Sequence, residues 1–195
     1  MEAGADALGF IFAPSSRRIT PEKAREIIRQ LPASVERIGV FLNGTVDEIR
    51  KVVMEVDLTG IQLHGNEFAP EIWSYIPKTR RDQLRIIKTI LVRDRFEMNL
   101  DMGMAVPGVV DAWLFDSGAG SGKTFDWQAA RVQLGERQGR FIIAGGLTPE
   151  NAGEAVRTFS PWGVDAVSGI EAEPGRKDPE KLKAFVAAVR KAEHQ

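Results

Sequence analysis

The fold is decided by the stretch Arg140-Phe141-Ile142-Ile143-Ala144-Gly145-Gly146-Leu147-Thr148-Pro149-Glu150-Asn151. Its first five residues form a short apolar run without polar alternation, which is typical of a strand buried on both faces of a parallel sheet. Thr148-Pro149 places a capping oxygen before a first-turn proline. Apolar residues then recur at i, i+3, i+4 and i+7, namely at Ala152, Ala155, Val156 and Phe159. The stretch therefore predicts a strand, a glycine turn and a helix.

This unit repeats along the chain. Six further apolar runs predict strands at Ala7–Phe12, Glu36–Phe41, Gly60–His64, Leu84–Ile90, Ala112–Phe115 and Val164–Ser168. Helices are predicted after the caps Thr20-Pro21 and Asp178-Pro179, after the capping box that runs from Thr45 to Glu48, and after Glu67, Asp94 and Asp126. Alternating strands and helices predict an α/β domain with a parallel sheet.

Two architectures fit seven such units. An open doubly wound sheet lacks its glycine fingerprint here, because the first run leads into a loop that holds Arg17 and Arg18. A (β/α)8 barrel requires one unit more than the chain provides. The segment from Met1 to Asp6 reads like the end of a helix with Gly4 as its stop, so a first unit would be missing.

Composition limits the function. With 195 residues, 43% of them apolar and 27% charged, the chain predicts one globular domain. Its net charge of -1 favours neither nucleic acid nor an anionic membrane as a partner. It contains no cysteine and two histidines, which excludes disulfides and zinc ribbons within these residues. Without an apolar run of about 18 residues or a signal segment, a soluble cytoplasmic protein is expected.

Charged residues follow two of the early strands, and chemistry in parallel α/β folds collects past the carboxyl ends of strands. Arg17 and Arg18 lie in a Pro/Ser loop and suit a carboxylate or a phosphate, although a solvated loop is the alternative. His64 ends the third run. It would contact a substrate or serve as a packed, hydrogen-bonded structural histidine.

Asp116 follows the fifth run and precedes a glycine-rich segment. An acid beside such a segment suggests a general acid or base under a lid, whereas the alternative is an aspartate that only hydrogen-bonds the turn. The ending Gly122-Lys123-Thr124 is similar to that of a phosphate-binding P-loop, but Ser117 stands where that pattern needs glycine. A nucleotide hydrolase is therefore the least favoured reading.

Glycines follow the last two runs, where backbone N–H groups can approach a ligand closely. Phosphate bound by the loops after the last strands recurs in (β/α)8 enzymes. Two such turns favour phosphate over simple tight turns, and the residues concerned are Gly145, Gly146, Ser168 and Gly169.

Taken together, these motifs resemble the phosphoribosylanthranilate isomerases of tryptophan biosynthesis. The resemblance runs along nearly the whole chain. The motifs that carry it are Gly4–Phe10, Arg37–Phe41, Gln62–Gly65, Gly120–Trp127, Ala144–Asn151, Gly163–Glu171 and Pro174–Asp178.

The resemblance implies a TIM (β/α)8-type barrel, as a monomer or homodimer, that rearranges a small phosphorylated substrate without cofactor or metal. Asp116 falls on the family's general acid. Arg17, or Arg18, falls on the arginine that holds the anthranilate carboxylate. The phosphate is implied to sit on backbone amides of the four residues around the two late glycine turns.

The chain departs from the family in two places. Val167 stands where serine is usual, and the family's general base, a cysteine that ends the first strand, has no counterpart. We expect that the protein begins roughly 20–25 residues earlier, about one barrel unit, with Met1 an internal methionine. The single domain 1–195 would then be N-terminally incomplete and impaired as it stands. The alternative is a degenerate, non-catalytic barrel that binds a phosphosugar.

Overall fold

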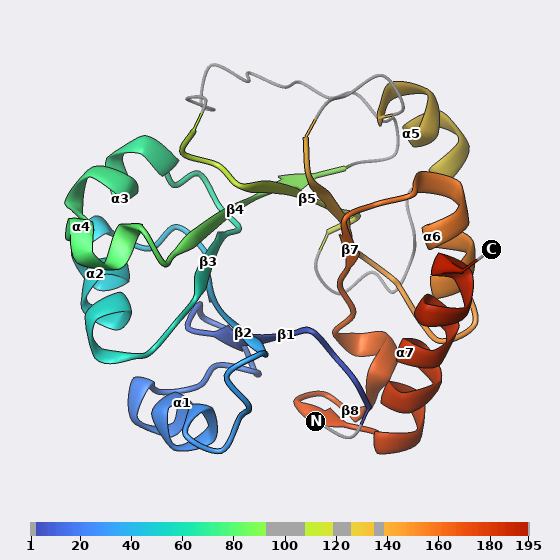
Figure 1. Cartoon of the computed structure of the whole chain (residues 1–195), viewed down its shortest axis with the longest axis horizontal. Coiled ribbons are helices and arrows are strands. Elements are labelled where there is room, and N and C mark those ends of the chain that lie inside the picture. The colour runs from blue at the N-terminus through green and yellow to red at the C-terminus, as the bar shows by residue number, and fades with distance from the viewer. Residues whose placement is uncertain (1–2, 93–107, 119–125, 135–138, 195) are drawn as a thin grey trace. The chain divides into compact units, whose positions relative to one another are not determined.

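The computed structural model describes residues 3–92, 108–118, 126–134 and 139–194 (Figure 1). Within these ranges the chain forms two compact units. The N-terminal unit holds Ala5–Thr89 with residues 108–111, and the C-terminal unit holds residues 3–4, 90–92 and the described part of 112–194. The helix expected after Asp94 and the segment 120–124 lie outside the described residues.

The N-terminal unit alternates strands with helices, as the sequence predicts. Its elements are β1 (Ala7–Ile11), α1 (Pro21–Ile28), β2 (Glu36–Phe41), α2 (Val46–Glu55), β3 (Gly60–Leu63), α3 (Ala69–Tyr75), α4 (Lys78–Arg81) and most of β4 (Arg85–Leu91). Each strand pairs in parallel with the next, with Ala7 opposite Glu36 and Gly60 opposite both Ile38 and Arg85.

The C-terminal unit continues the pattern and adds a hairpin. Its elements are β5 (Ala112–Asp116), α5 (Trp127–Leu134), β6 (Phe141–Ile143), α6 (Ala152–Phe159), β7 (Gly163–Val164), the 3-10 turn η2 (Ser168–Ile170), β8 (Glu171–Glu173), β9 (Arg176–Lys177) and α7 (Pro179–Glu193). The pairs β5–β6 and β6–β7 are parallel, whereas β8 and β9 pair antiparallel.

The strands follow one another in chain order from β1 to β7. Parallel neighbours need a crossover between them, and a helix in each crossover gives the βα unit. In the described parts of the chain, seven parallel strands stand at the predicted places and a helix follows six of them, which confirms an α/β fold of the TIM-barrel type. Among the described residues, β1 pairs only with β2 and β7 only with β6, as expected for the first and last strands of this series.

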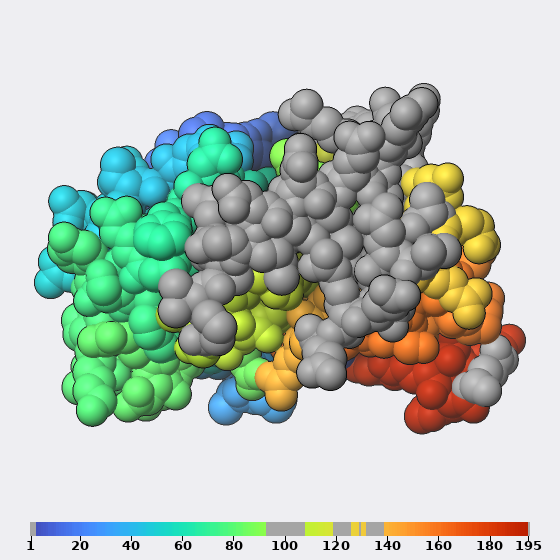
Figure 2. Space-filling view, turned by 90° about the horizontal axis from the view of Figure 1, so that it is seen from above, coloured from blue at the N-terminus to red at the C-terminus, as the bar shows by residue number. Residues whose placement is uncertain are grey.

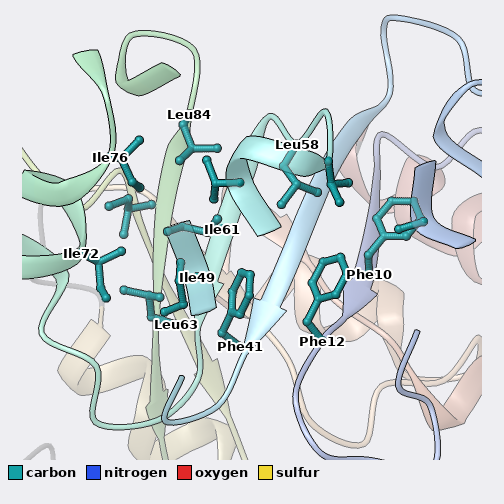
Figure 3. Close-up of a cluster of buried hydrophobic side chains, with 14 of the residues drawn as sticks. Phe10, Phe12, Phe41, Ile49, Leu58, Ile61, Leu63, Ile72, Ile76 and Leu84 are labelled. Carbon is teal, nitrogen blue, oxygen red and sulfur yellow. The ribbon is translucent and has the colours of Figure 1, made fainter. Parts of the chain in front are cut away.

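The core of the N-terminal unit lies between its strands and helices (Figure 3). Ile61 and Leu63 of β3 are fully buried and face Ile49 of α2. Phe12 and Phe41 stack with ring centroids 5.5 Å apart. All four residues of β3 are buried, which confirms a strand covered on both faces and explains the missing polar alternation.

The C-terminal unit has a core of its own. Helices α6 and α7 lie side by side, in orange and red in Figures 1 and 2. The predicted apolar face of α6 is correct, because Ala152 and Ala155 are fully buried and the ring of Phe159 meets that of Trp127 edge-on at 5.9 Å. None of the helices in the described parts of the chain combines the length and apolar character that crossing a bilayer needs.

Three of the four predicted caps are confirmed. Thr20 accepts the Lys23 N–H at the start of α1, and Asp178 accepts two N–H groups at the start of α7. At α2, Thr45 and Glu48 form the predicted capping box in both directions. Each cap satisfies an N–H group that would otherwise have no partner in the helix.

Two predictions in the C-terminal unit are wrong. Thr148 does not begin α6, which starts at Ala152 after Asn151; the Asn151 side chain binds the preceding turn instead. The last strand does not run to Ser168, because β7 ends at Val164 and the chain then turns into η2. A short apolar run gives no signal for where strand pairing stops.

Candidate functional site

In the N-terminal unit, the loop after β1 carries the two predicted arginines. The Ser15 hydroxyl accepts the Arg17 N–H at 3.1 Å, and the Ser15 carbonyl accepts the Arg18 N–H at 3.1 Å. The Ile19 N–H returns to the Ile11 carbonyl, which closes the loop beyond the strand. Arg17 is half-buried and Arg18 is exposed.

His64 follows the carboxyl end of β3, as predicted. Its N–H donates to the Phe41 carbonyl, and its Nδ1 lies 3.3 Å from Nε2 of Gln62. Gln62 is buried and its Nε2 also donates to the Thr89 hydroxyl. The ring thus contacts a side chain of its own strand, the backbone N–H of His64 binds the neighbouring strand β2, and the residue is half-buried at the strand end. Both sequence interpretations, a structural histidine and a ligand contact, are compatible with this placement.

A buried ion pair supports the turn after His64. Glu67 accepts the Gly65 N–H at 2.8 Å and the Gly44 N–H at 3.3 Å. Its carboxylate lies 3.8 Å from Nζ of Lys88, and the two side chains are 1% and 11% exposed. The Lys88 ammonium also donates to the carbonyls of Leu63 and Gly65. Two buried charges thus bind both polar groups of Gly65.

Burial and the ion pair act in opposite directions on the Lys88 ammonium. Desolvation lowers the pKa of the Lys88 ammonium, and the nearby Glu67 carboxylate opposes that shift. A buried cation is tolerated only where it is paired and hydrogen-bonded, as Lys88 is here. The ammonium therefore orders the end of β3 through its hydrogen bonds, although burial disfavours its charged form.

In the C-terminal unit, Asp116 stands at the end of β5, as predicted. Its Oδ1 accepts the Gly118 N–H at 2.9 Å, and its backbone carbonyl accepts the Val92 N–H at 2.7 Å. Asp116 is half-buried. The hydrogen bond to Gly118 shows that the carboxyl group orders the turn, and its position at the strand end leaves it suited to acid–base chemistry.

The glycine turn after β6 packs against this aspartate. Gly145 adopts φ +84°, and a Cβ there would lie 2.8 Å from Oδ1 of Asp116 and collide with Ser117. Asn151 fixes the same turn, because its Oδ1 accepts the Thr148 N–H at 2.8 Å and its Nδ2 donates to the Gly146 carbonyl at 3.0 Å. A close approach and a positive φ together require glycine at this position.

Gly145→Ala should reduce the free energy of unfolding by about 2–4 kcal/mol, since both the positive φ and the collision are unfavourable. Gly139→Ala is the matched control, because Gly139 has φ +120° with nothing near its would-be Cβ. Chemical denaturation followed by circular dichroism measures both variants. Equal losses for the two would show that the approach to Asp116 contributes nothing.

The predicted segment Ser168-Gly169 lies directly against this turn. A Cβ on Gly169 would collide with the Leu147 carbonyl, so the backbones of the two loops are in contact. Ser168 and Gly169 open η2, and Ser168 is exposed. The structure thus brings Gly145, Gly146 and the start of η2 together within one unit. Backbone N–H groups of such loops can bind an anion.

Sequence reasoning missed the residues that support these loops. Glu67, Lys88, Asn151, Glu171 and Lys177 bind loop backbone, yet as residue types they give no signal until burial and partners are known. Among the described residues, no group of three or more His, Asp or Glu side chains is placed to hold a metal ion.

Residues 1–188 match the family model described as N-(5'-phosphoribosyl)anthranilate (PRA) isomerase. The chain is 44% identical, over 190 residues, to the N-(5'-phosphoribosyl)anthranilate isomerase of Bacillus cereus, covering 95% of this chain and 88% of that protein.

Solved structures agree. The phosphoribosyl anthranilate isomerase of Thermus thermophilus matches with a TM-score of 0.80 and 35% identity, covering 97% of this chain and 90% of that one. A phosphoribosyl anthranilate isomerase in complex with reduced 1-(o-carboxyphenylamino)-1-deoxyribulose 5-phosphate matches with a TM-score of 0.79 and 33% identity over the same shares.

Proposed function

Because the chain belongs to the N-(5'-phosphoribosyl)anthranilate isomerase family, we propose that it catalyses the Amadori rearrangement of N-(5'-phosphoribosyl)anthranilate in tryptophan biosynthesis, as a monomer or homodimer. The product is 1-(2-carboxyphenylamino)-1-deoxyribulose 5-phosphate. The single observation that carries this proposal is the match over 95% of the chain at 44% identity.

Asp116 is the proposed general acid. It would protonate the furanose ring oxygen, so that the C1–O bond breaks and the anthranilate nitrogen stabilises C1 as an iminium. A general base would then take the C2 proton of the iminium to give an enolamine, which tautomerises to the ketone product. The position of Asp116 at the end of β5 and the hydrogen bond that orients its Oδ1 support its role as the general acid.

The remaining roles are those that the family resemblance implies for the predicted binding residues. Arg17, or Arg18, would bind the anthranilate carboxylate through its guanidinium, and His64 would contact the substrate from the end of β3. The phosphate would accept hydrogen bonds from backbone N–H groups of Gly145, Gly146, Ser168 and Gly169. The contact between the two loops that hold these residues supports the phosphate assignment.

The general base implied by the resemblance is a cysteine, and these 195 residues contain none. We therefore propose that the 195-residue chain is impaired on its own. General acid–base groups contribute about 10²–10⁴-fold each, so its turnover should fall below that of the Bacillus cereus relative by a factor of this order.

Turnover of N-(5'-phosphoribosyl)anthranilate, measured beside binding of the reduced deoxyribulose phosphate, tests the proposal. We expect binding together with slow conversion, and the Bacillus cereus isomerase is the positive control. A chain that neither binds the reduced compound nor converts the substrate would overturn the proposed function.

A second candidate is a non-catalytic barrel that binds a phosphosugar. The absent cysteine favours it, because a binding protein needs no general base. Its distinguishing result is tight binding of the reduced compound with no conversion of the substrate, unchanged when an N-terminal segment that carries the cysteine is supplied.

A further inference from the structure

Lys177 stands outside the predicted site, yet its ammonium contacts the loop that opens η2. Its Nζ donates to the Val167 carbonyl at 2.8 Å and to Oε1 of Glu171 at 3.2 Å. Val167 directly precedes Ser168, the first residue of η2. One cation therefore bridges the hairpin that follows η2 and the peptide bond that enters it.

The anchor of this bridge is a buried carboxylate. The Glu171 side chain is 4% exposed, and its Oε1 also accepts the Gly175 N–H at 3.2 Å. The Glu171 backbone carbonyl accepts a further bond, from Nζ of Lys181 at 2.9 Å. A carboxylate buried to this extent needs such partners, and it pairs with Lys177, whose own side chain is 43% exposed.

Fixing the Val167 carbonyl also fixes the next N–H group. The peptide between Val167 and Ser168 is planar and trans, so its C=O and N–H groups point in opposite directions. With the carbonyl held by Lys177, the Ser168 N–H is directed away from the hairpin. Its direction is therefore set by a side chain nine residues further along the chain.

We propose that Lys177, anchored by Glu171, is a positioning residue for phosphate binding, because it aims the Ser168 N–H at the phosphate. The inference rests on the proposed function, which places the phosphate on this amide. Preorganised N–H groups bind an anion better than groups that must be ordered on binding.

Inorganic phosphate, titrated into the full chain and followed by amide signals in NMR, tests the inference. We expect Lys177→Met to weaken phosphate binding about tenfold or more, the effect of losing one charge-assisted hydrogen bond. The Ser168 signal should lose most of its response, while those of Gly145 and Gly146 retain theirs. This selective loss distinguishes positioning from a general loss of structure.

Lys183→Met is the matched control, because Lys183 is an exposed lysine of α7 paired with Glu180 and its removal changes the net charge equally. It should leave the phosphate affinity unchanged. Lys177→Arg should restore part of the affinity. Lys177→Gln serves if the methionine variant does not fold, since the shorter amide cannot bridge both partners and should weaken binding similarly.

Two results would overturn the inference, and they are distinguishable. If the Ser168 amide of the unaltered chain does not respond to phosphate, the proposed phosphate site is wrong and the inference falls with it. If the unaltered chain responds and a folded Lys177 variant binds phosphate equally well, the site stands and the positioning role is wrong.

Discussion

Asp116→Asn lowers kcat by about 10²–10⁴-fold if the carboxyl group is the general acid, because an amide cannot donate the required proton. Affinity for reduced 1-(o-carboxyphenylamino)-1-deoxyribulose 5-phosphate should change little, because asparagine keeps the oxygen that accepts the Gly118 N–H. Rates of substrate conversion and binding of the reduced compound, measured on the same preparation, give the two quantities.

Asp47→Asn is the matched control for this substitution. Asp47 is exposed in the first turn of α2, so the same chemical change there should leave turnover unaltered. An Asp116→Asn variant with undiminished kcat would remove Asp116 from the mechanism. Equal losses of turnover and affinity would instead show that Asp116 acts in binding.

Lys88→Met should reduce the free energy of unfolding by about 3–5 kcal/mol, the usual effect of removing one partner from a buried ion pair. The Glu67 carboxylate, 1% exposed, would lose its cation and keep only its N–H donors. Urea denaturation followed by circular dichroism measures the loss. Lys51→Met, on the exposed side of α2, is the control and should change the stability little.

The pH dependence of stability provides a check on the same pair. Burial lowers the pKa of Lys88 below its ordinary value of 10.5, so the folded chain releases this proton at a lower pH than the unfolded chain. Between these two pKa values the unfolded chain binds more protons, and the Lys88 contribution to stability rises with pH. The stability difference between the unaltered chain and Lys88→Met should therefore widen as the pH approaches 10.5.

The double variant Lys88→Met/Glu67→Gln shows whether the loss of stability comes from the unpaired Glu67 carboxylate. Removing both charges should recover much of the loss, because no uncompensated ion remains buried. A loss below about 1 kcal/mol for Lys88→Met alone, the range of exposed pairs, would show that the pair does not stabilise the strand end.

The periodic parts of the chain are predictable from sequence. The boundaries of β2 agree residue for residue, and the capping box at Thr45 forms as expected, because burial and capping act over a few neighbouring residues. The end of β7 and the start of α6 differ from prediction. The apolar pattern signals neither cause: the Asn151 side chain binds the turn before α6, and Gly169 approaches Leu147, which is far away in the sequence.

The candidate site also contains residues that the sequence predicts and residues that only the fold reveals. Asp116, Arg17 and the late glycines stand at strand ends, a position that sequence reveals directly. Lys88 and Glu67 bind backbone groups at the ends of two strands, β2 and β3, and neither residue type signals that role. Supporting residues are defined by what they touch, so they emerge only once the fold is known.

The two separate cores have a practical spectroscopic consequence. Of the four tryptophans, only Trp73 packs in the N-terminal unit, while Trp113 and Trp127 pack in the core of the C-terminal unit and Trp162 lies beside Arg140 there. Intrinsic fluorescence therefore reports mainly on the C-terminal unit, whereas circular dichroism reports on the helices of both. Superposition of the two denaturation curves is the criterion for one cooperative transition, and their separation would make a single unfolding free energy undefined.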